Sequence, residues 1–172
     1  MFSFVLMILM AEDITNDTGK SIEKGDTVSV NYVGKLEDGT IFDTSVKEAA
    51  MEAGIYNQMR DYKPLTFTVG AGQMIKGFDE GVIGMRAGEE KTLEIPPEEA
   101  YGERSEELTR ELPIEAVDFT PEVGMRLATD TGLTGTITEV SESNFVVDFN
   151  HELAGKTLIF LVGIVSVEES KE

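Results

Sequence analysis

The strongest constraint on the fold is a pair of alternating segments on either side of an Asp-Gly turn. Val28, Val30 and Tyr32 alternate with polar residues, which is the period of a strand with one buried face. Residues 38–39 are the Asp-Gly dipeptide typical of a tight hairpin, and residues 41–43 begin the returning strand. The sequence therefore predicts an antiparallel hairpin near the start of the folded part of the chain.

Further strands are expected wherever short apolar or β-branched runs are bounded by turn residues. These runs lie at residues 65–69, 91–95, 125–129, 135–140, 145–149 and 157–167. Residues 103–111 are instead polar and rich in charge, which indicates a crossing into a second unit. The runs between residues 125 and 149 predict that this second unit is rich in β-structure.

Two segments have the period of a helix. In residues 46–62, Met51, Ile55 and Met59 recur at helical spacing among good helix formers. A shorter helix is expected around residues 78–85, where apolar side chains fall on one side between two glycines. The stripe in residues 46–62 is expected to pack in the core. A role in gripping a bound molecule is the alternative, because methionine surfaces adapt to varied partners.

The composition excludes several classes of function. There are 33 Asp and Glu against 14 Lys and Arg, for a formal net charge of −19, whereas a nucleic-acid-binding protein needs a basic stripe. The chain has no Cys and a single His, His151, so disulfides, thiolate nucleophiles and sites built from several histidines are not expected. Residues 70–72 lack the Lys-Ser/Thr of a phosphate-binding loop. We therefore expect neither a cofactor nor a metal ion.

Residues 1–20 are expected to be an extension outside the fold. Residues 2–11 are apolar apart from one Ser, and they supply only half of the roughly 20 residues that span a bilayer. The first basic residue is Lys20, so the positive start of an export signal is missing. Initiation at Met7 or Met10 is the favoured interpretation, and a weak export signal or a membrane-facing peptide is the alternative. No stable membrane insertion is expected.

The aromatic residues are spread over the predicted elements in an unusual way. Each of six comes from a different element, and two carry hydroxyl groups: Tyr32, Phe42, Phe67, Phe78, Tyr101 and Phe160. Such a set commonly forms part of a core. It would equally line a concave apolar pocket with a few polar groups, and the residues alone leave both interpretations open.

Four blocks of sequence resemble, in this order, the signature of the FKBP-type peptidyl-prolyl cis-trans isomerases. They are residues 30–45 (VNYVGKLEDGTIFDTS), 67–70 (FTVG), 74–82 (MIKGFDEGV) and 95–102 (IPPEEAYG). The resemblance implies an α+β fold, in which an antiparallel sheet wraps around a short helix. It also implies cis–trans isomerisation of Xaa-Pro bonds as the activity.

Within the family, the chain resembles the archaeal and SlyD-type branch, whose flap carries an inserted domain. The resemblance implies an isomerase domain of residues 21–102 and 151–168, a small β-rich insert-in-flap chaperone domain of residues 103–150, and a tail of residues 169–172. Residues 150–155 (NHELAG) resemble the re-entry motif of that branch, and residues 46–62 a helical insertion in the bulge. The tail lacks the histidines of SlyD, so nickel binding is not carried over.

The resemblance also assigns site residues. The catalytic pocket would be formed by Tyr32, Phe42, Asp43, Ile75, Phe78, Tyr101 and Phe160. Further substrate contacts would come from Leu65, Phe67, Met74, His151 and Leu153. The backbone N–H of Ile75 and the hydroxyl of Tyr101 would donate hydrogen bonds to the substrate. Asp43 would orient neighbouring polar groups, or would only satisfy local turn donors. Phe78 stands where the best-known members have Trp, and Leu65 where many have an aromatic residue. Macrolide-type inhibitors are candidate ligands of this pocket.

The expected partners are unfolded or partly folded polypeptides with Xaa-Pro bonds, bound by a cytoplasmic monomer. The inserted domain would bind extended segments through apolar surface and open strand edges. His151 would reach the pocket edge or make a structural hydrogen bond. The alternative function is a catalytically weak holdase or interaction module on the same scaffold, which Tyr32, Asp43 and Tyr101 argue against.

Overall fold

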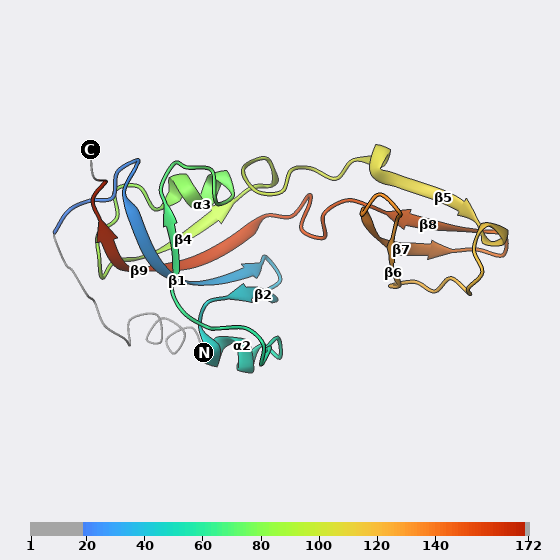
Figure 1. Cartoon of the computed structure of the whole chain (residues 1–172), viewed down its shortest axis with the longest axis horizontal. Helices are drawn as coiled ribbons and strands as arrows, with labels where there is room; N and C mark the ends of the chain where they lie inside the picture. The colour runs from blue at the N-terminus through green and yellow to red at the C-terminus, as the bar shows by residue number, and fades with distance from the viewer. Residues whose placement is uncertain (1–18, 171–172) are drawn as a thin grey trace. The chain divides into compact units, whose positions relative to one another are not determined.

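The computed structural model describes residues 19–170, so the expectations for residues 1–18 and 171–172 lie outside the described part. Residues 19–100 and 156–170 form one compact unit, and Tyr101–Gly155 form a second. Each unit is built around an antiparallel sheet (Figure 1). Among the described residues, no helix is long and apolar enough to cross a membrane.

The first unit contains a five-stranded sheet. Its strands are β1 (Thr27–Leu36), β2 (Ile41–Thr44), β3 (Leu65–Thr68), β4 (Glu90–Ile95) and β9 (Leu158–Glu168). β9 pairs along the whole length of β1, and β4 pairs with the other side of β9. The remaining edge of β1 is shared, because β3 pairs with its first half and β2 with its second half. The predicted hairpin is confirmed, and Gly39 adopts a φ of 88° in its turn.

Two short helices cover the two faces of this sheet. They are α2 (Lys47–Glu52) and α3 (Lys76–Gly81). Phe160 and Leu161 are neighbours on β9 and point to opposite faces. Leu161 packs beside Ala49 of α2, and Phe160 contacts the ring of Phe78 on α3. A Cβ on Gly81 would lie 2.7 Å from the Leu93 side chain, so the glycine lets α3 approach β4 closely.

The prediction of a long helix over residues 46–62 is wrong. α2 has six residues, and Gly54 follows it with a φ of 72°. The side chains of the expected stripe are exposed rather than packed in the core: Met51 58%, Ile55 37% and Met59 93%. The only buried residues of α2 are two alanines. They offer too little apolar surface to stabilise a longer helix.

The second unit contains a four-stranded sheet in the order β5-β8-β7-β6. Its strands are β5 (Thr109–Pro113), β6 (Arg126–Ala128), β7 (Thr134–Val140) and β8 (Asn144–Asp148). One face packs into a small core around Ile137, Phe145 and Val147. Short 3-10 helices complete the chain: η1 (Pro97–Glu99) in the first unit, and η2 (Glu106–Leu108) and η3 (Ile114–Ala116) in the second.

β5 is the strand that the sequence did not predict. It falls partly in residues 103–111, whose polar composition indicated a crossing between units. β5 lies at the edge of the sheet, and its Arg110 and Glu111 are exposed. β5 is stabilised by backbone hydrogen bonding to β8 along all five residues. Because backbone hydrogen bonds do not depend on the side chains, β5 shows no alternation of apolar residues from which it could be predicted.

Candidate functional site

Five aromatic rings meet on the face of the first sheet that carries α3, and we call them the aromatic cluster. Its members are Tyr32, Phe42, Phe67, Phe78 and Phe160. Phe78 lies at the centre, with ring centroids 6.1 Å from Tyr32, 5.8 Å from Phe67 and 5.1 Å from Phe160. Phe42 contacts Phe160 edge-on at 5.5 Å. These edge-to-face arrangements are favourable for aromatic pairs.

The aromatic cluster has a buried floor and a partly open rim. Phe78 and Phe67 are 1% and 4% exposed, whereas Phe42 on β2 is half-buried. A glycine on β1 makes the arrangement possible. A Cβ on Gly34 would lie 2.8 Å from ring atoms of both Phe42 and Phe160, which is too close for any other residue without a shift of the rings.

A polar group of three side chains borders the aromatic cluster. The Tyr32 hydroxyl donates a hydrogen bond of 2.7 Å to Oδ2 of Asp43. The Arg60 guanidinium donates to Oδ1 of Asp43 at 2.5 Å and to the Tyr32 oxygen at 3.2 Å. Asp43 also accepts from the backbone N–H of Thr44 at 2.8 Å. The Asp43 carboxylate therefore accepts hydrogen bonds from two polar side chains and from a local backbone donor.

The environment of this polar group changes its proton affinities. Burial is the main cause that raises the pKa of Tyr32 to about 12, and its hydrogen bond to Asp43 adds to the effect, while Arg60 opposes it. The hydrogen bond to Asp43 raises the pKa of Arg60 above its ordinary value. Tyr32 therefore remains a hydrogen-bond donor, and Arg60 a cation, throughout the neutral range.

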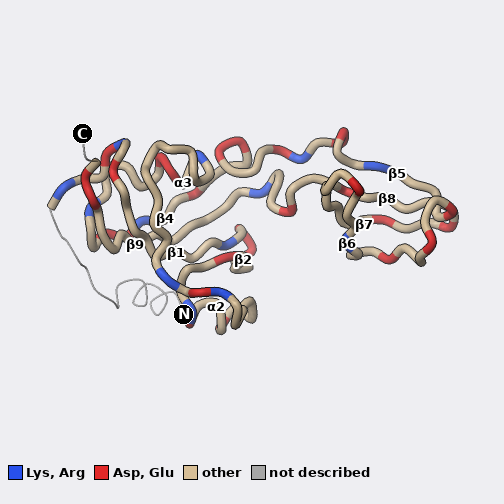
Figure 2. Tube along the Cα trace, viewed as in Figure 1, with Lys and Arg blue, Asp and Glu red and all other residues tan. Residues whose placement is uncertain are grey.

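Arg60 was not among the site residues predicted from the sequence; it lies in the segment between α2 and β3, and its side chain reaches Asp43. Its neighbours hold it in place. The rings of Tyr56 and Tyr62 stack at 5.6 Å, the Tyr62 hydroxyl accepts from the backbone of Asn57, and the guanidinium lies 5.3 Å from the Tyr62 ring centre. Lys and Arg are sparse along the chain (Figure 2). An Arg inside the predicted bulge insertion was the only available signal.

Backbone anchors fix Tyr32 itself. The Thr44 hydroxyl donates to the Tyr32 carbonyl at 2.7 Å, and the Ser45 hydroxyl accepts from the Tyr32 N–H at 2.9 Å. Both hydroxyl residues are buried. The end of β2 is thereby fastened to β1, which keeps Asp43 opposite the Tyr32 ring.

Three further predicted residues lie on the first unit around α3. Leu65 begins β3 and is half-buried. Ile75 is the N-cap of α3, and among the described residues its backbone N–H has no acceptor. Met74 is half-buried and lines a separate cavity of about 190 Å³ together with Lys24 and Ile83.

The other three predicted residues, Tyr101, His151 and Leu153, belong to the second unit. The rings of Tyr101 and His151 stack with centroids 3.9 Å apart and an interplanar angle of 3°. Nδ1 of His151 accepts a hydrogen bond from the backbone N–H of Leu153 at 3.1 Å. A structural hydrogen bond is therefore one role of His151. Tyr101 is 43% exposed.

Among residues 19–170, no three His, Asp or Glu side chains gather in an arrangement that could hold a metal ion. The aromatic cluster itself presents an apolar surface with the Tyr32 phenol, the Asp43 carboxylate and the Arg60 guanidinium at its border.

The fold and the four ordered sequence blocks define one class of protein. The sequence pattern of the FKBP-type peptidyl-prolyl cis-trans isomerases matches residues 19–164. The chain belongs to this family, and the antiparallel sheets with few helices agree with the fold class that the sequence predicted.

Two curated relatives show which members of the family this chain is similar to. A short-type peptidyl-prolyl cis-trans isomerase of Methanocaldococcus jannaschii is 46% identical over 153 residues, which cover 87% of this chain and 96% of the relative. The FKBP-type peptidyl-prolyl cis-trans isomerase SlyD of Vibrio cholerae is 35% identical over 156 residues, covering 88% of this chain and 71% of that protein. The chain is therefore similar to the archaeal and SlyD-like members, as the sequence indicated.

Proposed function

We propose that this chain isomerises Xaa-Pro bonds of polypeptides at the aromatic cluster. The observation that carries the proposal is the pairing of a water-poor aromatic floor with the polar group of Tyr32, Asp43 and Arg60 on its border. The barrier to rotation about a peptide bond is about 18–20 kcal/mol, because amide resonance must be broken. Unaided Xaa-Pro bonds therefore exchange over tens of seconds.

Desolvation accounts for the acceleration. Resonance places partial charges on the carbonyl oxygen and the nitrogen, so water stabilises the planar amide more than the twisted one. A proline ring seated on Phe78 and Phe160 loses that water, and the twisted state is relatively favoured. The reaction needs no covalent intermediate and no proton transfer, which suits a site whose Tyr32 remains a neutral phenol because burial raises its pKa.

Individual groups would then position the substrate. The unpartnered N–H of Ile75 at the start of α3 supports its role as a donor to a substrate carbonyl. The second donor role, which the family resemblance implies for the Tyr101 hydroxyl, is supported by the partial exposure of this residue. We assign Arg60 as a positioning residue: its two hydrogen bonds hold Asp43 and Tyr32 in one arrangement. Pre-organised groups of this kind lower the barrier without reorganising during the reaction.

The test is exchange spectroscopy on short Xaa-Pro peptides, with a matched pair of Tyr→Phe variants. Tyr101→Phe should raise the activation free energy of the catalysed isomerisation by about 0.5–1.5 kcal/mol, the value of one hydrogen bond. Tyr56→Phe is the control, because its ring stacks on Tyr62 and its hydroxyl plays no part in the proposal. An intact protein that leaves exchange at the uncatalysed rate would support the alternative function, a holdase or interaction module.

We further propose that the second unit, Tyr101–Gly155, contains the insert-in-flap chaperone domain predicted for residues 103–150. Its exposed apolar side chains support the binding of unfolded chains: Leu108, Phe119, Val123, Met125, Leu133 and Val140 are 37–66% exposed. The strands β5 and β6 form the two edges of its sheet, and open edges can pair with an extended segment. Because such a site is covalently linked to the isomerase unit, it would raise the effective concentration of prolyl substrate.

The neck of the second unit supports its excision as a test. The Gly155 N–H donates to the Gly102 carbonyl at 2.8 Å, so the incoming and outgoing segments meet. Asn150 joins them again through two hydrogen bonds with the backbone of Ser105 at 2.9 and 3.0 Å. A short linker in place of residues 103–150 should therefore leave the first unit folded.

The excised protein should keep its activity on short peptides. It should lose most of its acceleration of a proline-limited protein refolding reaction and its suppression of aggregation. Unchanged refolding catalysis would remove the chaperone role. Macrolide-type inhibitors, a monomeric state and a cytoplasmic location remain predictions from the sequence.

A further inference from the structure

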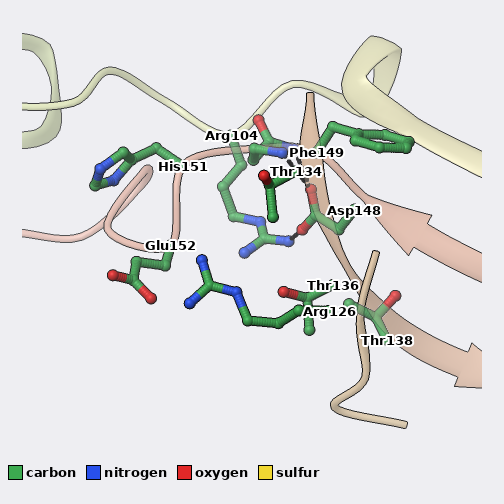
Figure 3. Close-up of a pocket in the computed structure, with 10 residues that line it drawn as sticks. Arg104, Arg126, Thr134, Thr136, Thr138, Asp148, Phe149, His151 and Glu152 are labelled. Atoms are coloured by element: carbon green, nitrogen blue, oxygen red, sulfur yellow. Dashed lines mark hydrogen bonds and ion pairs between the residues drawn. The ribbon is translucent and has the colours of Figure 1, made fainter. Parts of the chain in front are cut away.

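The second unit contains a polar cavity of about 610 Å³ that the isomerase chemistry does not use. We call it the threonine–arginine cavity. It is lined entirely by residues of that unit: Arg104, Arg126, Thr134, Thr136, Thr138, Asp148, Phe149, Asn150, His151 and Glu152. Its volume lies in the range of pockets that hold small ligands or side chains. Figure 3 shows the side chains that surround it.

The sheet register explains why these residues gather. Arg126 on β6 is opposite Thr136 on β7, and Thr136 is opposite Asp148 on β8. The residues next to them in sequence, among them Ile137 and Val147, form the small core. Because side chains alternate along a strand, the row from Arg126 to Asp148 stands on the opposite, outer face of the sheet.

Of the two acidic groups at the cavity, Asp148 is already committed. Its side chain is 7% exposed and forms an ion pair with Arg104. It also accepts hydrogen bonds from Asn150, at 2.8 Å from the backbone and 2.7 Å from the side chain. The Arg104 stem lies against Gly155, where a Cβ would come within 3.1 Å. Arg104 is still 52% exposed, and one ion pair uses only part of its five N–H donors.

Arg126 is in a different situation. Within residues 19–170, the side chain of Arg126 has no hydrogen bond or ion pair, although the chain carries more than twice as many acidic as basic residues. Figure 3 shows its guanidinium turned toward the same part of the cavity as that of Arg104, with Glu152 beyond it. Glu152 likewise has no partner in the described part of the chain. Two guanidinium groups with open donors beside threonine hydroxyls form the donor set that binds carboxylates best.

We propose that the threonine–arginine cavity binds a carboxylate of an extended polypeptide, which rests on the proposed role of the second unit in binding unfolded chains. Arg126 is the main anchor, Arg104 supplies further N–H donors, and the Thr136 hydroxyl borders the site. The carboxylate is an Asp or Glu side chain, or the terminal carboxylate of the bound chain. The net charge of −19 repels acidic segments of a bound polypeptide over most of the protein. At this cavity the two arginines attract a carboxylate instead.

The test uses the full chain and labelled, proline-free, unstructured peptides that differ only at one central position, Glu or Gln. Each peptide is made with a free and with an amidated C-terminus, which separates the two sources of the carboxylate. At low salt, fluorescence anisotropy should report the Glu peptide about fivefold tighter than the Gln peptide, a modest factor because the groups are partly exposed. If the terminal carboxylate is the ligand, the Glu and Gln peptides will bind equally well, and amidation will weaken the binding of both.

Three variants locate the effect. Arg126→Gln should abolish the fivefold preference. Arg110→Gln is the matched control, because Arg110 lies outside the cavity and donates to backbone carbonyls of Glu107 and Thr109. Glu152→Gln should strengthen binding of the Glu peptide, because it removes the carboxylate that stands beside Arg126. A Lys peptide should bind no better than the Gln peptide.

The outcomes are distinct. Equal affinity of all peptides in the unaltered protein, survival of the preference in Arg126→Gln, or a preference for Lys overturns the proposal. Equal and tight binding leaves the chaperone role standing and removes only the carboxylate site. An NMR titration with a glutamate whose two termini are blocked tests the site without any unfolded polypeptide. Its readout is the chemical shift of the backbone amides of Arg126 and Thr136. Shifts there, together with no binding of unfolded chains, would leave the site standing and remove the chaperone role.

Discussion

Replacement of Tyr32 by Phe should change how the stability of the protein depends on pH in the alkaline range. The Tyr32 hydroxyl is buried beside Asp43, which raises the pKa of Tyr32 from an ordinary 10 to about 12. Between these two pH values the unfolded chain releases the Tyr32 proton while the folded chain still holds it. The free energy of unfolding therefore falls as the pH rises through this window. A pKa raised by about 2 corresponds to roughly 3 kcal/mol.

The magnitude is measured as a difference between two proteins. Denaturant unfolding from pH 9 to 12 is compared for the unaltered chain and Tyr32→Phe, so that the three shared tyrosines and the lysines cancel. The stability advantage of the unaltered chain should shrink by about 2–3 kcal/mol across the window. In parallel, the near-ultraviolet absorbance of the phenolate should report one late-titrating tyrosine, absent in the variant. Titration of all four tyrosines together, or a stability difference that stays constant with pH, would refute the assigned environment of Tyr32.

Three other perturbations test separate parts of the description. Arg60→Ala should lower kcat/KM several-fold and leave the melting temperature nearly unchanged, because the ion pair is 35–40% exposed; Arg60→Lys should recover part of the activity, and equal activity of all three proteins would remove the positioning role. Gly34→Ala should destabilise the protein by about 1–3 kcal/mol, because its methyl group meets two rings of the aromatic cluster, and a neutral effect on thermal unfolding would contradict that packing. Asp26→Asn should destabilise at neutral pH, because Asp26 is 1% exposed and accepts bonds from Lys20, Glu23 and Ser170. Burial opposes the charge of Asp26, but these hydrogen bonds outweigh the effect of burial and lower the pKa of Asp26. The loss of stability in the variant should therefore disappear as the pH falls below the ordinary range of Asp. A loss of stability that does not depend on pH would argue against a role of the charge.

Local patterns in the sequence were sufficient for most of the strands. The alternation of Val28, Val30 and Tyr32 predicts β1 because the period of a strand and the burial of one face are both written into consecutive residues. The Asp-Gly turn predicts the hairpin with β2 for the same local reason. Four of the five ring residues of the aromatic cluster lie in segments whose motifs resemble a known family, and Phe160 was identified with them as an aromatic residue of the last strand.

Tertiary structure decided the features that depend on contacts distant in sequence. The helical spacing of Met51, Ile55 and Met59 is real, yet α2 stops after six residues because only its alanines find a surface to pack on. β5 has no apolar period, and it is a strand because β8 offers it backbone partners. Helical propensity is weak compared with burial, and strand pairing at an edge needs no pattern of side chains.

The sequence by itself determined the family, most of the strands and most residues of the aromatic cluster, because those depend on local periods and on motifs of adjacent residues. Only the tertiary structure brought Arg60 to Asp43 across 17 positions of sequence, and only the register of β6, β7 and β8 aligned Arg126, Thr136 and Asp148 on one face. The physical reason is the same in both cases. Each of these polar arrangements depends on groups that are distant in the sequence and are brought together only by the fold, so no single stretch of residues predicts it.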